Sequence, residues 1–257
     1  MSENLEIVPV RAFQDNYIWV MRRGGDAAVV DPGDARPVLE YLTATKLRLV
    51  AIINTHHHND HVGGNAGLLE RFKVPVYGPG REQIPTLTQR LNEGDSIRVP
   101  ELDIEFTVLD IPGHTAGHIA FFGAGVLFCG DTLFACGCGK LFEGTPAQMY
   151  ASLSKLARLP DATRVYCGHE YTLSNIKFAK AADPLNEKLL ALEATARRLR
   201  EQDLPTLPST IGMEKLTNPF LRCSEPAVIE SASKAAGRPL DDPVSVLAAI
   251  REWKNRF

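Results

Sequence analysis

A run of histidines with one aspartate limits the folds open to this chain more than any other sequence feature. It follows Leu47–Ile53, which is rich in β-branched residues and has the length of a buried strand. Directly after this strand comes Thr55–His61, with the sequence THHHNDH. Alternate side chains of an extended backbone face the same way, so His56 and His58 can converge on one point while His57 faces away. Imidazole and carboxylate groups at a strand end predict a metal site in an α/β protein.

The other histidines follow the same pattern. All 7 histidines lie in three short segments, and the second and third segments also follow strand-like runs. PGHTAGH at 112–118 carries His114 and His118, and GHE at 168–170 carries His169. A fourth apolar run leads into Asp131. For a lone histidine a solvated polar turn would be the simpler interpretation, but four strand exits with ligand-type residues predict a metal centre.

Composition limits the class of protein. A chain of 257 residues with 44% hydrophobic residues suits one large domain, or a main domain with an appendage. The net charge of −3 does not suggest a nucleic-acid binder, and no apolar run approaches the length of a membrane span. We expect no signal peptide, because the first residues lack a basic region before an apolar one. The 5 cysteines lack a disulfide pattern, so free thiols and a cytoplasmic location are expected.

The order of predicted elements divides the chain near residue 170. Short strands are expected at 5–10, 17–22, 27–30 and 47–53, and residues 90–128 are rich in strand signals. Asp34 and Thr145 are expected to cap helices that carry a proline in the first turn. Residues 133–140 are expected to form a glycine-bearing loop. Beyond residue 170 strand signals nearly vanish, and helical patterns cover 186–202, 225–236 and 242–256.

The candidate ligands are numerous enough for two metal ions. One set is His56, His58 and His114; a second is Asp60, His61 and His169; Asp131 has two carboxylate oxygens and can bridge them. Two divalent ions carry four positive charges, and two aspartates with a bridging hydroxide neutralise three of them. One positive charge remains to stabilise an oxyanion. Because metal-bound water has a pKa of about 7, a metal-bound hydroxide is the expected nucleophile. This donor set indicates hydrolysis rather than a closed structural zinc site.

The motifs THHHNDH, PGHTAGH, GDTLF and GHEYT resemble the signature of the metallo-β-lactamase superfamily. The particular residues in these motifs resemble those of the glyoxalase II (hydroxyacylglutathione hydrolase) family. Similar segments are VDPG, GCGK, NPFLR and the C-terminal REWK, so the resemblance covers nearly the whole chain. It implies an α/β fold: an αββα sandwich at 1–169 with a binuclear site at its edge, and a helical substrate-binding domain at 170–257. It also implies hydrolysis of S-(2-hydroxyacyl)glutathione, typically S-D-lactoylglutathione, to glutathione and D-lactate, the second step of methylglyoxal detoxification.

The resemblance also implies roles for individual residues. The two ligand sets and Asp131 match the family's metal ligands, with Asp60 and Asp131 at the catalytic centre. Positions that hold glutathione in the family correspond to Lys140, Tyr171, Arg251 and Lys254. Phe142 departs from members that carry a glutathione-binding tyrosine there, which puts one hydrogen bond in doubt. Zinc is the expected metal, although nitrogen and oxygen ligands also accept iron or manganese. We expect a monomer whose only partner is the small glutathione thioester.

Several alternatives compete with these interpretations. His57 and His118 are expected to support ligands rather than bind metal, and Asp31 is expected to be a turn residue with a possible supporting bond. Arg251 and Lys254 alone would suit the basic last turn of any helix. A lactonase, β-lactamase or nuclease could use the same metals. A sulfur dioxygenase acting on glutathione persulfide would use a single iron. The two-metal ligand set and the helical tail favour the thioester hydrolase.

Overall fold

The computed structural model describes residues 4–257, which divide into two compact units. Unit 1 contains the described residues up to Asp110 together with Thr115–Gly130, and unit 2 contains Ile111–His114 together with Asp131–Phe257. The units follow contacts in space, whereas the predicted domain boundary between residues 169 and 170 follows composition. That boundary stays a prediction.

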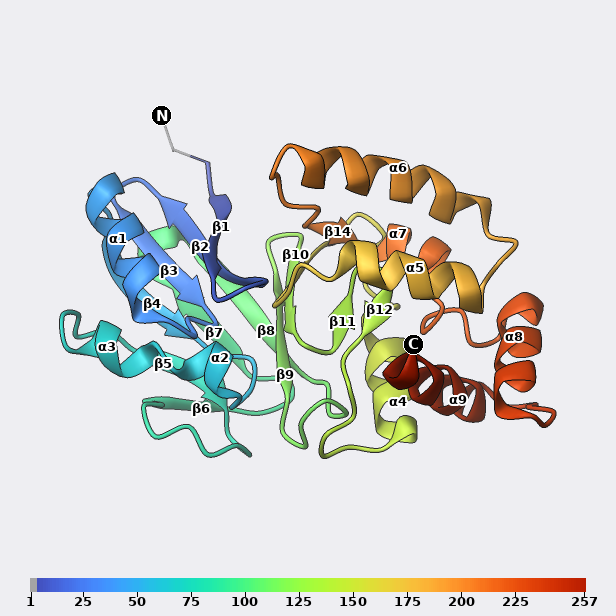
Figure 1. The fold of residues 1–257 in the computed structure, drawn as a ribbon. Coiled ribbons are helices and arrows are strands. Elements are labelled where there is room, and N and C mark those ends of the chain that lie inside the picture. The colour runs from blue at the N-terminus through green and yellow to red at the C-terminus, as the bar shows by residue number, and fades with distance from the viewer. Residues whose placement is uncertain (1–3) are drawn as a thin grey trace. The chain divides into compact units, whose positions relative to one another are not determined.

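The first sheet of unit 1 has six strands in the order of the chain (Figure 1). The first three strands pair antiparallel, and β3 to β6 pair parallel. The strands are β1 (Glu6–Ala12), β2 (Asn16–Arg23), β3 (Asp26–Val30), β4 (Arg48–Ile53), β5 (Val76–Pro79) and β6 (Gln89–Leu91). The strands predicted from β-branched runs are therefore confirmed, with ends shifted by a residue or two.

Short helices cover one face of this sheet. They are α1 (Ala35–Thr45), α2 (Asn59–Val62) and α3 (Asn65–Leu69). Asp34 caps α1 as predicted, because its side chain accepts a hydrogen bond from the Arg36 amide at 2.9 Å. Val38 and Leu42 of α1 pack with sheet residues such as Val29 in one apolar core. This packing holds the end of β4, and with it the histidine motif, in a fixed place.

The second sheet of unit 1 is antiparallel, in the order β10-β9-β8-β7. Its elements are β7 (Ser96–Val99), the short 3-10 helix η1 (Pro100–Leu102), β8 (Ile104–Asp110), β9 (Ile119–Gly123) and β10 (Val126–Gly130). Ala124 and Gly125 both have positive φ, 50° and 73°, which suits the tight hairpin turn between β9 and β10. The two sheets and their helices confirm the predicted α/β class.

Unit 2 is mostly helical. Its elements are β11 (Leu133–Phe134), β12 (Gly137–Cys138), α4 (Pro146–Leu156), β13 (Arg164–Cys167), α5 (Thr172–Ala182), α6 (Glu187–Glu201), β14 (Ser209–Thr210), α7 (Ile211–Thr217), α8 (Pro226–Ala236) and α9 (Pro243–Arg256). Thr145 caps α4 as predicted, with Gln148 completing a reciprocal capping box. The predicted helices at 186–202, 225–236 and 242–256 are confirmed as α6, α8 and α9.

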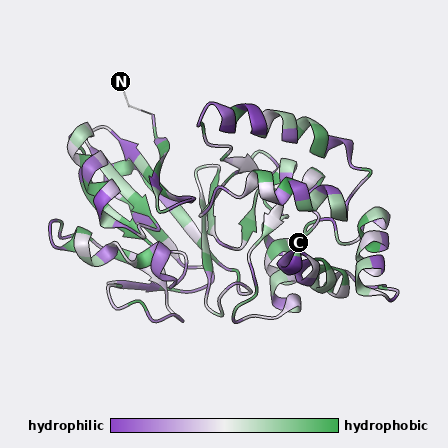
Figure 2. Ribbon diagram, in the orientation of Figure 1, coloured by the Kyte–Doolittle hydropathy of each residue, from purple (hydrophilic) through white to green (hydrophobic). Residues whose placement is uncertain are grey.

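Several elements of unit 2 were not predicted. Helix α5 buries residues on several faces, including Thr172, Asn175 and Phe178, so its sequence lacks an amphipathic stripe. The segment predicted as a loop at 133–140 contains the β11–β12 hairpin, and α7 is a short helix. By contrast, α6 alternates hydrophilic and hydrophobic residues, as Figure 2 shows. Within residues 4–257, no helix is both long and apolar enough to cross a membrane.

Candidate active site

The histidine motif of unit 1 places two ring nitrogens close together, as its alternation predicts. His56 is fully buried, and its Nε2 lies 3.2 Å from Nδ1 of His58. Two nitrogens on one tetrahedral zinc, each 2.0–2.1 Å from it, would lie about 3.3 Å apart. His57 points elsewhere, with its Nδ1 2.9 Å from Oε2 of Glu82. The separation of His56 and His58 therefore suits two ligands of one metal ion.

Asp60 and His61 form a second pair in unit 1. Oδ2 of Asp60 lies 3.5 Å from Nε2 of His61, and Asn16 donates a hydrogen bond of 3.0 Å to the same oxygen. The other ring nitrogen of His61, Nδ1, lies 3.0 Å from Oδ2 of Asp31. A carboxylate on one imidazole nitrogen orients the ring and directs the second nitrogen to a metal. Nε2 is thus the nitrogen of His61 that would bind a metal.

Asp31 is a supporting residue rather than a simple turn residue. It follows β3 with a positive φ of 53° and is 4% exposed. Its carboxylate accepts hydrogen bonds from the amide of Thr55 at 2.8 Å and from the Thr55 hydroxyl at 2.7 Å, besides its contact with His61. The supporting bond that the sequence left open is therefore present. These hydrogen bonds of Asp31 connect the start of the THHHNDH motif to the end of β3, the strand that pairs parallel with β4.

Glu82 is a second supporting residue, and the sequence analysis missed it. It lies between β5 and β6, is 4% exposed, and accepts hydrogen bonds from the Thr115 hydroxyl and the Gly117 amide as well as contacting His57. No local pattern marks this glutamate, because its partners lie far along the chain. It connects the THHHNDH motif to Thr115 and Gly117, the part of the PGHTAGH motif that belongs to unit 1.

Gly130, the last residue of β10, allows close packing beside the motif. A Cβ atom at this position would lie 2.3 Å from the Thr55 hydroxyl and 2.8 Å from Nε2 of His118, and φ is +46°. The buried His118 ring stacks on His56 with centroids 4.5 Å apart. Any larger residue at position 130 would displace the Thr55 hydroxyl and the His118 ring.

Unit 2 carries the other predicted ligands around Asp131. Oδ2 of Asp131 lies 3.6 Å from Nε2 of His114 and 3.2 Å from Nε2 of His169. The carbonyl of Lys140 lies 2.9 Å from Nδ1 of His114, which again leaves Nε2 as the nitrogen that would bind a metal. The ring of Tyr171 stacks on His169, with centroids 4.8 Å apart and planes within 2°. One oxygen of Asp131 therefore approaches both histidines, as a bridging carboxylate would.

The donor atoms fit divalent metal ions. Every predicted ligand offers an imidazole nitrogen or a carboxylate oxygen, and the same donors suit zinc, iron and manganese. The pairs predicted to share a metal within a unit lie close together: His56 with His58, Asp60 with His61, and Asp131 with each of His114 and His169. His56 and His61, predicted to bind different ions, are also neighbours, with ring centroids 4.1 Å apart. The chemistry available to this donor set is Lewis-acid hydrolysis.

A cavity of about 400 Å³ in unit 2 contains both ligand-type residues and cations. Its lining includes His114, Asp131, Phe134, Cys138, Lys140, Phe142, Tyr171, Asn175, Arg251 and Lys254. The four residues predicted to bind substrate are therefore all present, together with two of the predicted ligands. An anionic molecule in this cavity would meet three positive side chains.

Arg251 and Lys254 are held rigidly on α9. The Arg251 side chain is 5% exposed, donates a 2.6 Å hydrogen bond from Nη1 to the carbonyl of Cys138, and lies over the ring of Phe220. Its buried Nε has no hydrogen-bond partner within the described part of the chain. Lys254 donates to Oδ1 of Asn175. Burial and the nearby Arg251 lower the pKa of Lys254 to about 8.

The remaining cavity residues differ in exposure. Lys140 is exposed although it lines the cavity, so its charge stays in contact with water. Phe142 is 63% exposed, and its ring meets that of His114 edge to face at 5.3 Å. A phenyl ring has no hydroxyl, so Phe142 supplies an apolar wall where a tyrosine would donate a hydrogen bond.

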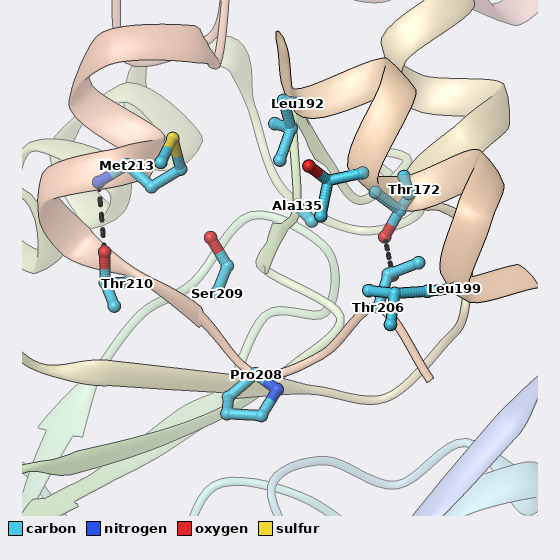
Figure 3. Close-up of a pocket in the computed structure, with 11 residues that line it drawn as sticks. Ala135, Thr172, Leu192, Leu199, Thr206, Pro208, Ser209, Thr210 and Met213 are labelled. Carbon is cyan, nitrogen blue, oxygen red and sulfur yellow. Dashed lines mark hydrogen bonds between the residues drawn. The ribbon is translucent and has the colours of Figure 1, made fainter. Parts of the chain in front are cut away.

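A second cavity of unit 2, about 190 Å³, has a different character. Figure 3 shows its wall, which includes Leu192 and Leu199 of α6 and the hydroxyls of Thr172, Thr206 and Ser209. None of the described residues that line it is ionisable. It therefore does not suit an anionic substrate or a metal ion.

Comparison with known proteins agrees with this description. A family model described as "Metallo-beta-lactamase superfamily" matches residues 12–169. Two solved structures are similar over most of the chain. ETHE1 from Myxococcus xanthus is 24% identical with a TM-score of 0.65, covering 98% of both chains, and shows the fold alone. A di-iron-bound form of TTHA1623 is 29% identical with a TM-score of 0.59, covering 84% of this chain and all (100%) of that one. These matches define the class of fold.

Two further matches define the family. A model described as "Hydroxyacylglutathione hydrolase C-terminus" matches residues 170–257. A hydroxyacylglutathione hydrolase from Nitrosomonas eutropha is 58% identical over 253 residues, covering 98% of this chain and 99% of that protein. The chain belongs to the hydroxyacylglutathione hydrolase family of the metallo-beta-lactamase superfamily.

Proposed function

We propose that this protein hydrolyses S-(2-hydroxyacyl)glutathione thioesters, with S-D-lactoylglutathione as the typical substrate, to glutathione and a 2-hydroxy acid. The observation that carries the proposal is the cavity of unit 2, where Asp131 and His114 line the same space as Arg251 and Lys254. Metal-ligand chemistry and fixed cations in one cavity suit a substrate with an acyl group to cleave and carboxylates to bind. The full-length similarity to hydroxyacylglutathione hydrolases supports the same substrate class.

Two divalent metal ions are part of this proposal. His56, His58 and His114 would hold one ion, Asp60, His61 and His169 the other, and Asp131 would bridge them. The close pairs within each unit and the di-iron-bound relative support this assignment. Bound there, the ions would supply a water-derived nucleophile at neutral pH and polarise the thioester carbonyl. We propose zinc first, with iron or manganese as alternatives that accept the same nitrogen and oxygen donors.

The chain's own residues would bind and orient the glutathione part of the substrate. The fork of Arg251 can pair with a carboxylate through two parallel hydrogen bonds, and Lys254 adds a compact charge beside it. Lys140 is exposed and would reach the substrate from the rim of the cavity. Tyr171 would act partly through His169, because its stacked ring fixes the orientation of that imidazole. Phe142 would contact substrate only through its apolar ring.

The leaving group needs little help from the protein. Cleavage of the carbon–sulfur bond releases a thiolate, and a thiol has a pKa of about 8.5. At neutral pH such a group departs with little protonation, so a dedicated general acid is unnecessary. This fits a cavity that positions the substrate beside His114 and Asp131.

Turnover tests this function directly. Purified protein with metal content measured on the same sample should hydrolyse S-D-lactoylglutathione at neutral pH, without oxygen or reductant, and release one glutathione per thioester. Oxygen consumption with glutathione persulfide, combined with no thioester hydrolysis, would instead identify a dioxygenase. Hydrolysis of simple lactones or β-lactams in preference to the glutathione thioester would also overturn the proposal.

A cytoplasmic location and a monomeric state complete the proposal. All five cysteines are buried and unlinked, and free thiols are the usual state in a reducing compartment. Cell fractionation and light scattering of the purified protein test these two statements. Recovery of the protein outside the cytoplasm, or a stable dimer at low concentration, would contradict them.

A further inference from the structure

The β11–β12 hairpin forms part of the substrate cavity but is too small to hold its own shape. Each strand has only two residues, and Phe134 and Cys138 line the cavity. An isolated hairpin is marginal even when much longer. The turn also contains Cys136 in the left-handed region, with φ of 55°, which a non-glycine residue adopts at a cost. Contacts from outside the hairpin must therefore hold it.

Side chains from α5, from the middle of α7 and from its C-cap hold the backbone of this turn. Oε2 of Glu214 accepts a hydrogen bond from the Cys136 amide at 2.8 Å. Nδ2 of Asn218 donates to the carbonyls of Phe134 and Gly137, at 3.1 and 2.9 Å. Asn175 donates to the carbonyl of Ala135 at 2.9 Å. Backbone polar groups at four consecutive buried positions thus depend on three side chains.

Glu214 and Asn218 also bond to each other and are completely buried. Nδ2 of Asn218 donates to Oε2 of Glu214 at 3.0 Å, and both residues are 0% exposed. The hydroxyl of Ser209, which lines the uncharged cavity of Figure 3, donates to the other oxygen of Glu214. A buried carboxylate is costly, and an apolar side chain of similar size would fill the space more cheaply. Three groups donate hydrogen bonds to the Glu214 carboxylate, which indicates that the fold needs a hydrogen-bond acceptor at this position.

The hairpin connects this pair to Arg251. Cys138 directly follows Gly137 on β12, and the Cys138 carbonyl accepts the 2.6 Å bond from Nη1 of Arg251. We propose that Glu214 and Asn218 are positioning residues that hold β11–β12, so that the Cys138 carbonyl fixes the Arg251 guanidinium for glutathione. This inference rests on the proposed function, because it concerns how the same cavity recognises its substrate.

Substitution of Glu214 tests the inference through the split between KM and kcat. Glu214→Ala leaves the Cys136 amide without its acceptor and should raise KM for S-D-lactoylglutathione about ten-fold, while kcat changes less than two- to three-fold. Glu214→Gln should restore KM, because its amide oxygen still accepts from Cys136 and its amide nitrogen can donate to Ser209. Glu214→Asp provides a milder variant that keeps the charge but shortens the reach.

A double-mutant cycle separates positioning from general destabilisation. If Glu214 acts through Arg251, Glu214→Ala should add little to KM when Arg251→Ala is already present. Asp183→Ala is the matched control: Asp183 is a buried carboxylate of the same unit that binds Arg222 and Asn186. It should lower the melting temperature without raising KM.

Binding of S-methylglutathione, measured by calorimetry on every variant, gives a readout independent of turnover. A wild-type KM and glutathione affinity in folded Glu214→Ala and Glu214→Asp would overturn the positioning role. A full additional loss on top of Arg251→Ala would overturn it too. If the wild type binds S-methylglutathione but does not hydrolyse the thioester, the proposed function fails while the affinity series still decides the role of Glu214. Absence of glutathione binding by the wild type would overturn both.

Discussion

Among single residues, Lys254 has a charge that depends directly on its surroundings. Its pKa is lowered to about 8 by burial and by Arg251. As pH rises through this value the ammonium is lost, and with it the charge proposed to pair with a substrate carboxylate. KM for S-D-lactoylglutathione should therefore rise by about ten-fold from pH 7 to pH 9.5, with a smaller change in kcat. Initial rates corrected for uncatalysed hydrolysis measure this.

Lys254→Arg is the control for this pH effect. A guanidinium stays protonated throughout the range, so the variant should show a nearly flat KM between the same pH values. An equally steep rise in the arginine variant would assign the titration to another group.

Arg251 should contribute binding energy rather than chemical acceleration. In the proposed complex it pairs with the glutathione end of the substrate, where no charge develops during cleavage, so its contact would be similar in the ground and transition states. Arg251→Ala should lower kcat/KM by roughly ten- to a hundred-fold, mostly through KM. The comparison substrate is a thioester without glutathione carboxylates. Wild type and variant should process it equally slowly, and a persistent defect there would refute the anion-binding role.

At the scale of elements, the contact between α7 and the β11–β12 hairpin should make stability depend on pH. Burial raises the pKa of Glu214 to about 7 from an ordinary value of 4.5. Between these values the folded state binds more protons than the unfolded state, so stability falls as pH rises through this window. The contribution is on the order of 3 kcal/mol at most.

The Glu214→Gln variant isolates this contribution. Its amide does not titrate, so the difference in unfolding free energy between wild type and variant should shift in favour of the variant from pH 5 to pH 7.5. Urea denaturation at several pH values, with metal content held constant, measures the difference. A difference that does not change with pH would mean that the Glu214 carboxyl titrates normally.

For the whole molecule, the number of metal ions is the decisive quantity. Metal binding should stabilise the folded chain, because its proposed ligands are spread along the sequence from His56 to His169. Elemental analysis of protein purified without chelator should give about two equivalents of zinc, iron and manganese combined, as expected for a two-metal site. Asp131→Ala should reduce both equivalents, whereas His169→Ala should mainly reduce one. A firm value of one equivalent under saturating metal would contradict the binuclear site.

Much of the fold was predictable because its signals are local. The β-branched run before THHHNDH forms β4. The polar Thr145, followed by Pro146, begins α4. Helix α5 escaped prediction because it is buried on several faces and so lacks an amphipathic period. The hairpin β11–β12 escaped because its two-residue strands are held by other elements and carry no pattern of their own.

The residues that support the site were predictable only in part, because most of their partners are remote in sequence. The local sequence around Asp31 indicates only a turn residue, and the structure adds its contacts with Thr55 and His61. Glu82 carries no local signal at all. Glu214 bonds to Cys136 across 78 positions of sequence, and burial then changes its pKa. Such roles arise from desolvation and from which donors happen to surround an acceptor, and neither property belongs to a short segment.

The sequence by itself therefore determined most of the strands, most of the helices and the candidate ligands, because periodicity, caps and strand-end motifs act over a few residues. Tertiary structure alone decided which nitrogen of each histidine is oriented for a metal, and that Asp131 shares a cavity with Arg251 and Lys254. It also decided that a buried glutamate braces the hairpin beside them. The physical reason is that buried polar groups must find partners wherever the fold brings them, and those partners lie far away along the chain.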